Sequence, residues 1–288
     1  MCQNGVRGFS FVALMLLFVM QSAMAMDSSA KSKVTIPYKD GANIWVKSSA
    51  DHPVTFLELY SSQGCYSCPP AERWINTFVD DNRLWDTLIP VNFHVDYWDY
   101  LGWKDPFATP TFTLRQRKYE RLKDIQQVAT PGFVVSGKGW NGWFRRRPLP
   151  SYSQSRSIGH LQAKLVAEKI TLNYKINTPG NILFKSNNPK VHVAILGFDI
   201  VVPIEKGENS GLDFKHDFVV LAYQQVSMIQ TKNEWRTQLK KPVPNSNLVR
   251  INSTNDHLLE SNANKRAIVI WVSEGNKPKP LQVTGGWL

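Results

Sequence analysis

Cys65 and Cys68, separated by two residues, are the side chains of this 288-residue chain most able to do chemistry. They follow an apolar segment, residues 54–60, and precede two prolines and an amphipathic segment. A cysteine in the first turn of a helix faces unpaired backbone N–H groups and the positive end of the helix dipole, which stabilise a thiolate. The type, spacing and position of the two residues therefore predict a pair that exchanges disulfides.

The two cysteines are expected to have different roles. In thiol–disulfide exchange the attacking thiol must be exposed and ionised, while its partner waits behind it and releases the mixed disulfide. Cys65, in the turn before the helix, suits the first role, and Cys68, deeper in the first turn, suits the second. Tyr66, between them, is expected to contact the client. A purely structural disulfide is the alternative, although so short a loop constrains the unfolded chain very little.

Metal capture is the competing chemistry for the same thiols. A single C-x-x-C pair supplies two soft ligands, whereas zinc normally takes four. His94 is the nearest histidine, and a lone histidine in an apolar strand is commonly a hydrogen-bonded core residue. Two thiolates and one imidazole suit Cu(I) better than zinc. We therefore expect no resident metal, and keep a Cu(I)-handling or non-catalytic binding module as the second hypothesis.

Glu58 is the single acid in the apolar segment before the cysteines. A buried carboxylate without a partner tends to stay protonated, which would let it exchange a proton with a nearby thiol. It is therefore a candidate catalytic residue. A strand-edge acid that points into solvent is the alternative interpretation.

Thr130 and Pro131 precede another apolar segment, residues 132–135. A cis proline at this place would fix a tight backbone whose neighbouring peptide groups can pair with an extended client beside the sulfur atoms. Pro131 is therefore a candidate for shaping the client groove, and Thr130 for binding the client.

An aromatic segment follows the second apolar strand and includes Trp98 and Trp103. Clustered exposed aromatic side chains mark binding sites, so the two tryptophans can form a platform that holds a client. The same residues can instead be buried between two parts of the chain, with Trp271 and Trp287 as partners. The sequence slightly favours this second interpretation.

The pattern of apolar residues predicts the elements that position these side chains. Strands are expected at residues 54–60 and 88–95, with a helix between them that begins at residue 69. A further helix is expected at 113–124, a strand up to 135, and a helix at 157–169. Alternating apolar residues then predict an antiparallel β-sandwich. The predicted organisation is thus an α/β domain over residues 26–168 and an all-β, sandwich-like domain over residues 169–288.

The first 25 residues have the pattern of a secretory signal peptide, with one early positive charge, a short apolar run and small residues before Met26. No other long apolar run follows, so we expect a periplasmic or secreted protein without stable membrane insertion after cleavage. The net charge of +11 favours anionic surfaces. Export argues against nucleic acid as a partner, and the basic residues 145–147 are expected to be a solvated loop.

Neither a flavin nor a nicotinamide fingerprint is evident, so no cofactor is expected. The predicted partners are client proteins with thiols or disulfides, and another thiol protein that exchanges electrons with the pair.

The order of these elements, with C-x-x-C at a helix start and Thr130-Pro131 before a strand, resembles the thioredoxin fold. The chain is most similar to the exported thioredoxin-like proteins of the domain-of-unknown-function family twelve twenty-three. Three stretches carry this resemblance: residues 57–72, residues 94–107 and residues 285–288. The resemblance implies a thioredoxin-like domain followed by a β-domain, with the general thioredoxin roles at Cys65, Cys68 and Pro131.

Overall fold

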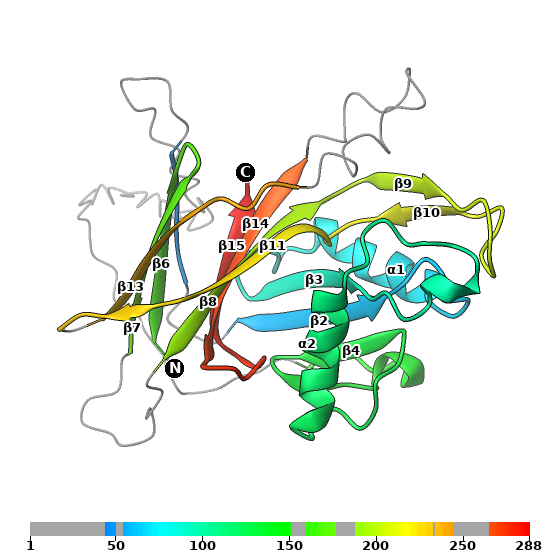
Figure 1. Ribbon diagram of the computed structural model, residues 1–288, viewed down its shortest axis with the longest axis horizontal. Coiled ribbons are helices and arrows are strands. Elements are labelled where there is room, and N and C mark those ends of the chain that lie inside the picture. The colour runs from blue at the N-terminus through cyan, green and yellow to red at the C-terminus, as the bar shows by residue number, and fades with distance from the viewer. Residues whose placement is uncertain (1–43, 50–53, 151–158, 177–187, 233, 245–264) are drawn as a thin grey trace, which may run out of the picture. The chain divides into compact units, whose positions relative to one another are not determined.

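The computed structural model describes residues 44–49, 54–150, 159–176, 188–232, 234–244 and 265–288 (Figure 1). The predicted signal peptide lies outside the described residues. About 45% of the described residues lie in strands and 15% in helices, so the fold is mostly β. Within the described ranges, no helix is long and apolar enough to cross a membrane.

Two α-helices and three short 3₁₀-helical turns occur among the described residues: α1 (Pro69–Asn76), a turn at Thr77–Asp80, a turn at Asp99–Leu101, α2 (Pro110–Arg121) and a turn at Trp143–Arg145. The strands of the first half of the chain are β1 (Ile44–Ser48), β2 (Thr55–Ser61), β3 (Leu88–His94), β4 (Gly132–Val135), β5 (Lys138–Gly139), β6 (His160–Val166) and β7 (Lys169–Lys175). Those of the second half are β8 (Pro189–Gly197), β9 (Ile200–Pro203), β10 (Asp213–His216), β11 (Val219–Ser227), β12 (Ile229–Gln230), β13 (Trp235–Lys240), β14 (Arg266–Glu274) and β15 (Pro280–Trp287).

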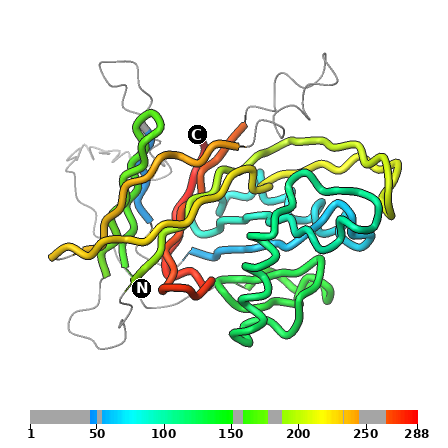
Figure 2. The backbone as a smooth tube through the Cα atoms, viewed as in Figure 1, coloured from blue at the N-terminus to red at the C-terminus, as the bar shows by residue number. Residues whose placement is uncertain are grey.

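An eight-stranded mixed sheet, in the order β15-β14-β8-β11-β3-β2-β4-β5, contains strands from both halves of the chain. β2 and β3 pair in parallel, as a strand–helix–strand unit requires. The neighbouring pair β3 and β11 is also parallel and joins the two halves, because Val219 is paired with Asn92 and the Asn92 N–H donates to Phe218 O at 2.9 Å. Figure 2 shows β8 and β11 running side by side beyond this junction, where their pairing is antiparallel.

The predicted fold class, an α/β thioredoxin-like domain followed by an all-β domain, is wrong. The mostly β composition and the eight-stranded sheet overturn it. The prediction took β2, β3 and β4 as a sheet of their own, which would leave one edge of β3 without a neighbour. In the structure β11 pairs with that edge, and an unpaired strand edge is what proteins generally cover.

The predicted helix over residues 157–169 is also wrong, because residues 160–166 form strand β6. Leu161 and Leu165 are four residues apart, which fits either a helix or a strand. Ala163 between them is also buried, whereas Gln162 and Lys164 are exposed, so the true period is two. β6 pairs with β7 as an antiparallel hairpin in a five-stranded sheet, in the order β1-β6-β7-β13-β12.

The elements around the cysteines agree with the sequence pattern. β2 and β3 are buried along their whole length, as expected of apolar strands covered on both faces. α1 begins at Pro69, and β4 ends at Val135. α2 starts three residues earlier than predicted, because the Thr109 hydroxyl accepts a hydrogen bond from the Thr111 N–H at 3.1 Å and so caps the helix.

Candidate functional site

Cys65 and Cys68 lie in the turn between β2 and α1, as the sequence predicts. Cys68 immediately precedes α1, and its carbonyl oxygen accepts hydrogen bonds from the backbone N–H groups of Ala71 and Glu72 at 2.9 and 3.1 Å. Pro69 occupies the first helical position, where no N–H donor is needed. Both thiols are free, so the structure shows the dithiol form of the pair.

The two thiols differ in exposure and in acidity. Cys65 is 4% exposed, and Cys68 is fully covered. The hydrogen bond with Cys68 lowers the pKa of Cys65, and hydrogen bonds with Ser67 and Thr130 lower it further; together they outweigh burial and bring that pKa from 9.0 to about 6. Burial raises the pKa of Cys68 well above its ordinary value. Cys65 is therefore the thiolate near neutral pH, and Cys68 keeps its proton.

The loop that contains Thr130 and Pro131 lies against Cys65. The peptide bond between these two residues is cis. The Thr130 carbonyl oxygen is 3.7 Å from the Cys65 sulfur and 3.4 Å from the Ser67 hydroxyl. Trp98 Nε1 donates to Thr130 Oγ1 at 2.6 Å. The structure thus brings four predicted site residues together from three segments, and the covering loop makes Cys65 less exposed than the sequence predicts.

The aromatic segment approaches the cysteine turn closely at Gly64. A Cβ atom at this position would lie 3.1 Å from the Trp98 carbonyl oxygen, so a glycine permits the approach. Trp98 stacks on Tyr100, with ring centroids 6.3 Å apart. Tyr100 is 76% exposed, and Tyr66 between the cysteines is 74% exposed. Exposed aromatic surface therefore flanks the cysteine pair.

Trp103 has a different environment from Trp98. Its Nε1 donates to Gln63 Oε1 at 2.8 Å, and its ring packs against a small apolar cluster built mainly from β9, β10 and β11. Trp103 thus joins the aromatic segment to a later part of the chain. Trp271 and Trp287 contact other rings, including Phe56 and Trp85 respectively.

Glu58 lies in a separate buried cluster. Its two carboxylate oxygens accept hydrogen bonds from Arg115 in α2 at 2.8 and 3.0 Å. The hydroxyl groups of Tyr60 and Tyr119 donate to the same carboxylate at 2.8 and 2.5 Å. Glu58 therefore anchors α2 to β2 through a buried ion pair, and these contacts do not direct it at a thiol.

Five buried side chains form a closed ring of polar contacts next to the cysteine turn. Gln63 Nε2 lies 2.9 Å from His216 Nε2, and His216 Nδ1 lies 3.2 Å from Glu72 Oε2. On the other side, His94 Nε2 lies 3.3 Å from Glu72 Oε1, and His94 Nδ1 lies 2.6 Å from Asp105 Oδ2. Asp105 Oδ2 also accepts the backbone N–H of Gln63 at 2.8 Å, which closes the ring.

The ring fixes the backbone that leads into Cys65. Asn209, from the loop between β9 and β10, donates through its Nδ2 to the carbonyl oxygens of Gln63 and Cys65 at 2.8 and 2.9 Å. The N–H, carbonyl and side chain of Gln63 are thus all held by hydrogen bonds, two residues before Cys65. The cysteine turn is therefore positioned by residues of β3, β10 and the β9–β10 loop.

The ring is strongly charged although it is buried. Burial lowers the pKa of His94, but the carboxylates of Asp105 and Glu72 outweigh it and raise that pKa to about 10. Burial raises the pKa of Glu72, but the imidazoles of His216 and His94 outweigh it and hold the pKa well below its ordinary value. His94 is thus protonated and Glu72 ionised near neutral pH.

Sequence reasoning missed most of this ring. Glu72 and Asp105 lie within the stretches that carry the family resemblance. Glu72 is close in sequence to the cysteines and Asp105 is close to His94, and this closeness is the signal that could have identified them. His216 and Asn209 are each 144 positions from their partners Glu72 and Cys65, and no local pattern connects positions so far apart.

The second hypothesis, a Cu(I) site, would combine His94 with the two cysteines. Both ring nitrogens of His94 face carboxylates, at Asp105 and Glu72. In the described part of the chain, the metal-ligating side chains that lie together are Glu72, His94 and His216, a group that includes neither cysteine.

Two solved structures are similar to this chain in fold. Protein AGR_C_4864 from Agrobacterium tumefaciens is 20% identical, with a TM-score of 0.50, and the match covers 83% of this chain and 96% of that one. HBP35 of Porphyromonas gingivalis is 12% identical, also with a TM-score of 0.50, and the match covers 83% of this chain and 76% of that one. The search of curated proteins finds no match.

A protein-family model described as "Protein of unknown function (DUF1223)" matches residues 56–251. The matched range includes both cysteines, the Thr130–Pro131 loop, every residue of the polar ring and Asn209. Because the match spans well over half of the sequence, this chain belongs to the DUF1223 family.

Proposed function

We propose that this protein exchanges disulfides with client proteins through Cys65 and Cys68. The observation that carries the proposal is the difference in acidity between the two thiols, with the pKa of Cys65 at about 6 and that of Cys68 raised. A thiolate attacks disulfides and a thiol does not, so this difference assigns the two roles. Outside the cytoplasm, where the chain is predicted to work, disulfides persist in client proteins.

The exchange has two steps. The Cys65 thiolate attacks one sulfur of a client disulfide, forms a mixed disulfide and releases the other client sulfur as a thiolate. The released thiolate, or the solvent, takes the proton of Cys68. The Cys68 sulfur then attacks the Cys65 sulfur, which forms the Cys65–Cys68 disulfide and releases the second client sulfur as a thiolate, and solvent supplies the proton that completes the client dithiol. The client gains two electrons, and a second thiol protein restores the pair by the reverse chemistry.

The acidity of Cys65 also bears on the direction of exchange. In pairs of this kind a lower thiolate pKa stabilises the reduced form and makes the disulfide more oxidising: a pKa of about 7 accompanies a potential of about −270 mV, and about 3.5 accompanies about −120 mV. A Cys65 pKa of about 6 therefore predicts a potential between these limits. Equilibration of the pair with glutathione measures it.

Client contact is assigned to the surface next to Cys65. Tyr66 and Tyr100 are largely exposed there, and the Thr130 carbonyl lies beside the sulfur. Aromatic side chains provide much of the binding energy at protein interfaces. An extended client segment can pair with the Thr130–Pro131 backbone while its side chains contact the two tyrosines.

The trapping experiment tests the proposal directly. In the Cys68→Ala variant the second step is blocked, so Cys65 should remain bound to clients as mixed disulfides that a reductant releases. The measurement is non-reducing gel electrophoresis and mass spectrometry after incubation with a synthetic disulfide-bonded peptide. The Cys65→Ala variant is the matched control and should form no adduct. Failure of the Cys68→Ala chain to form adducts, or equal adduct formation by the two variants, would contradict the proposal.

A further inference from the structure

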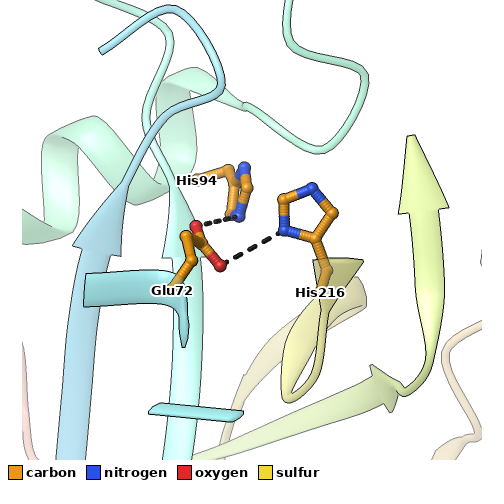
Figure 3. Close-up of side chains that lie close together, drawn as sticks. All are labelled: Glu72, His94 and His216. Atoms are coloured by element: carbon orange, nitrogen blue, oxygen red, sulfur yellow. Dashed lines mark hydrogen bonds and ion pairs between the residues drawn. The ribbon is translucent and has the colours of Figure 1, made fainter. Parts of the chain in front are cut away.

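Glu72, His94 and His216 meet in the interior of the protein, on α1, β3 and β10 respectively (Figure 3). The side chains of the histidines are fully buried, and that of Glu72 is 2% exposed. One ligand atom from each residue lies within 4.8 Å of the other two. Figure 3 shows the carboxylate between the two imidazoles, with one oxygen directed at each ring.

Two oxygen atoms at this place have no hydrogen-bond partner among the described residues: Glu72 Oε1 and Asn92 Oδ1. Glu72 Oε1 lies 3.3 Å from His94 Nε2 without forming a hydrogen bond. Asn92 Nδ2 lies 2.7 Å from Glu72 Oε2, so a rotation of the Asn92 amide would place its oxygen beside the same carboxylate. Buried acceptors without a donor are rare and call for an explanation such as an ion.

The cluster brings two carboxylates together in the interior of the protein. Trp103 donates to Gln63 Oε1, which makes Gln63 Nε2 the donor toward His216 Nε2 and leaves His216 Nδ1 directed at Glu72 Oε2. The carboxylates of Glu72 and Asp105 are both buried here and both lie within 3.3 Å of imidazole nitrogens. Buried charges are stable only when paired, and a divalent cation supplies two positive charges to two carboxylates.

We propose that Glu72, His94 and His216 bind one divalent transition-metal ion of the zinc type. Two imidazole nitrogens and a carboxylate are common ligands of such ions. Ligand atoms around a tetrahedral ion with bonds of about 2.0–2.1 Å are about 3.3 Å apart. The separations of 3.3 Å for His94 Nε2 to Glu72 Oε1 and 3.2 Å for His216 Nδ1 to Glu72 Oε2 are of this size, and one ligand atom from each of the three residues lies within 4.8 Å of the other two. Asn92, whose amide nitrogen faces Glu72 in the structure, would supply a further oxygen after rotation of its amide.

The carboxylate of Asp105 orients one of the proposed ligands, His94. Asp105 Oδ2, 2.6 Å from His94 Nδ1, holds that ring with its Nε2 toward Glu72, and a carboxylate behind a metal-bound histidine is the usual arrangement. A pocket of about 670 Å³ between α1 and β10 has Glu72, Asn76 and Lys215 among its lining residues, so an ion would enter from the side of Glu72.

Metal binding would change the contacts of Trp103. His216 can bind an ion through Nδ1 only if its Nε2 carries the proton, and the Gln63 amide must then turn its oxygen to that N–H. The turned amide can no longer accept the hydrogen bond from Trp103 Nε1. Because Trp103 is half-buried, water can replace Gln63 as the acceptor of its N–H, so ion binding should alter its fluorescence.

The inference does not rest on the proposed thiol chemistry, and the experiment separates the two. Zn²⁺ and Co²⁺ are titrated into the chelator-treated Cys65→Ser/Cys68→Ser chain, and binding is followed by calorimetry, tryptophan fluorescence and Co²⁺ absorption. We expect one ion per chain, a fluorescence change that Trp103→Phe abolishes without loss of binding, and a Co²⁺ spectrum without sulfur-to-metal charge transfer.

Variants identify the ligands. Glu72→Gln and His216→Gln should weaken Zn²⁺ binding at least tenfold. His192→Gln, which changes another buried histidine whose contacts are with Tyr223 and Ser273, should leave it unchanged. Absence of saturable binding by the Cys65→Ser/Cys68→Ser chain would overturn the proposal, even if a ligand variant failed to fold. Binding that is unaffected by both ligand variants would also overturn it.

Discussion

At the scale of single residues, Cys65 and Cys68 begin with the same chemistry and acquire different acidities from their positions. The Cys65 sulfur takes part in hydrogen bonds and Cys65 is 4% exposed, whereas Cys68 is fully buried. Burial opposes charge on both sulfurs, and the hydrogen bonds outweigh it only at Cys65. A reactive thiolate and a protonated partner thus arise from neighbouring positions of one turn.

Removal of the Ser67 hydroxyl should raise the pKa of Cys65. This hydroxyl lies 3.4 Å from the Cys65 sulfur, and hydrogen bonds to a charged group contribute about 1.5–3 kcal/mol, which corresponds to about one pH unit or more. The measurement is the pH dependence of Cys65 alkylation in Ser67→Ala. Ser210→Ala, which removes an exposed hydroxyl bonded to Glu205, is the control and should give the parent curve. A Ser67→Ala curve identical to the parent curve would contradict this explanation of the acidity.

The sequence predicts part of the candidate site. Local patterns place five of its residues at or just beyond the ends of predicted elements, and the structure brings these residues together: Cys65, Cys68, Trp98, Thr130 and Pro131. The predicted role of Glu58 rested on a buried acid without a partner, and the partner, Arg115, is 57 positions away on α2. A pattern within one strand cannot reveal a partner on another element.

At the scale of elements, α2 is held to β2 by the buried ion pair between Arg115 and Glu58. Arg115→Met should leave the carboxylate without its cation and reduce the free energy of unfolding by about 3–5 kcal/mol, as is typical of a broken buried pair. Urea denaturation measures the effect. The alkylation midpoint of Cys65 should not change, because these contacts do not reach the thiols. A loss below about 1 kcal/mol would show that the pair does not support the fold.

The β9–β10 loop positions the cysteine turn through Asn209. Asn209→Ala removes the donor to the carbonyl oxygens of Gln63 and Cys65, so the free energy of unfolding should fall by about 1–3 kcal/mol and disulfide exchange should slow. Rates with a synthetic disulfide peptide and urea denaturation provide the two measurements. Asn276→Ala, at an exposed asparagine bonded to Lys190, is the matched control. An exchange rate equal to that of the control would refute the positioning role.

Predictions of helices and strands were correct where a continuous apolar run fits only a buried strand. They failed where the spacing of apolar residues fits both a helix and a strand. β2 and β3 are continuous apolar runs that end in polar turns, and both were predicted within one residue at each end. Residues 160–166 contain Leu161 and Leu165, whose spacing suits a helix as well as a strand. Pairing with β7 decides between the two, and that pairing is a tertiary contact.

At the scale of the whole molecule, one sheet connects the cysteine turn to the strands of the second half. The pairing of β3 with β11 and the contacts of His216 and Asn209 make the site depend on both halves of the chain. The alternating apolar residues after position 169 predicted strands but could not show that these strands extend the first sheet, so the predicted separate all-β domain was wrong. The order of strands in a sheet depends on which strand edges pair with each other, and the periodicity of apolar residues does not reveal this pairing.

The stability of the reduced protein should depend on pH through Cys65. Its pKa is about 6 when folded and 9.0 ordinarily, so the folded state binds the proton more weakly than the unfolded state. Its contribution to stability is complete above pH 9, declines as the pH falls, and is lost below about pH 6. The difference in free energy of unfolding between the reduced chain and Cys65→Ser should therefore grow from pH 6 to 9. A difference that stays constant over this range would be inconsistent with a lowered pKa.

The most direct test of the thiol account is residue-resolved alkylation of the reduced chain with iodoacetamide from pH 4 to pH 10, followed by peptide mass spectrometry. The account predicts that Cys65 is modified with a midpoint near pH 6 while Cys68 stays protected until the protein is unfolded. A Cys65 midpoint near its ordinary value of 9.0, or modification of Cys68 before Cys65, would contradict it.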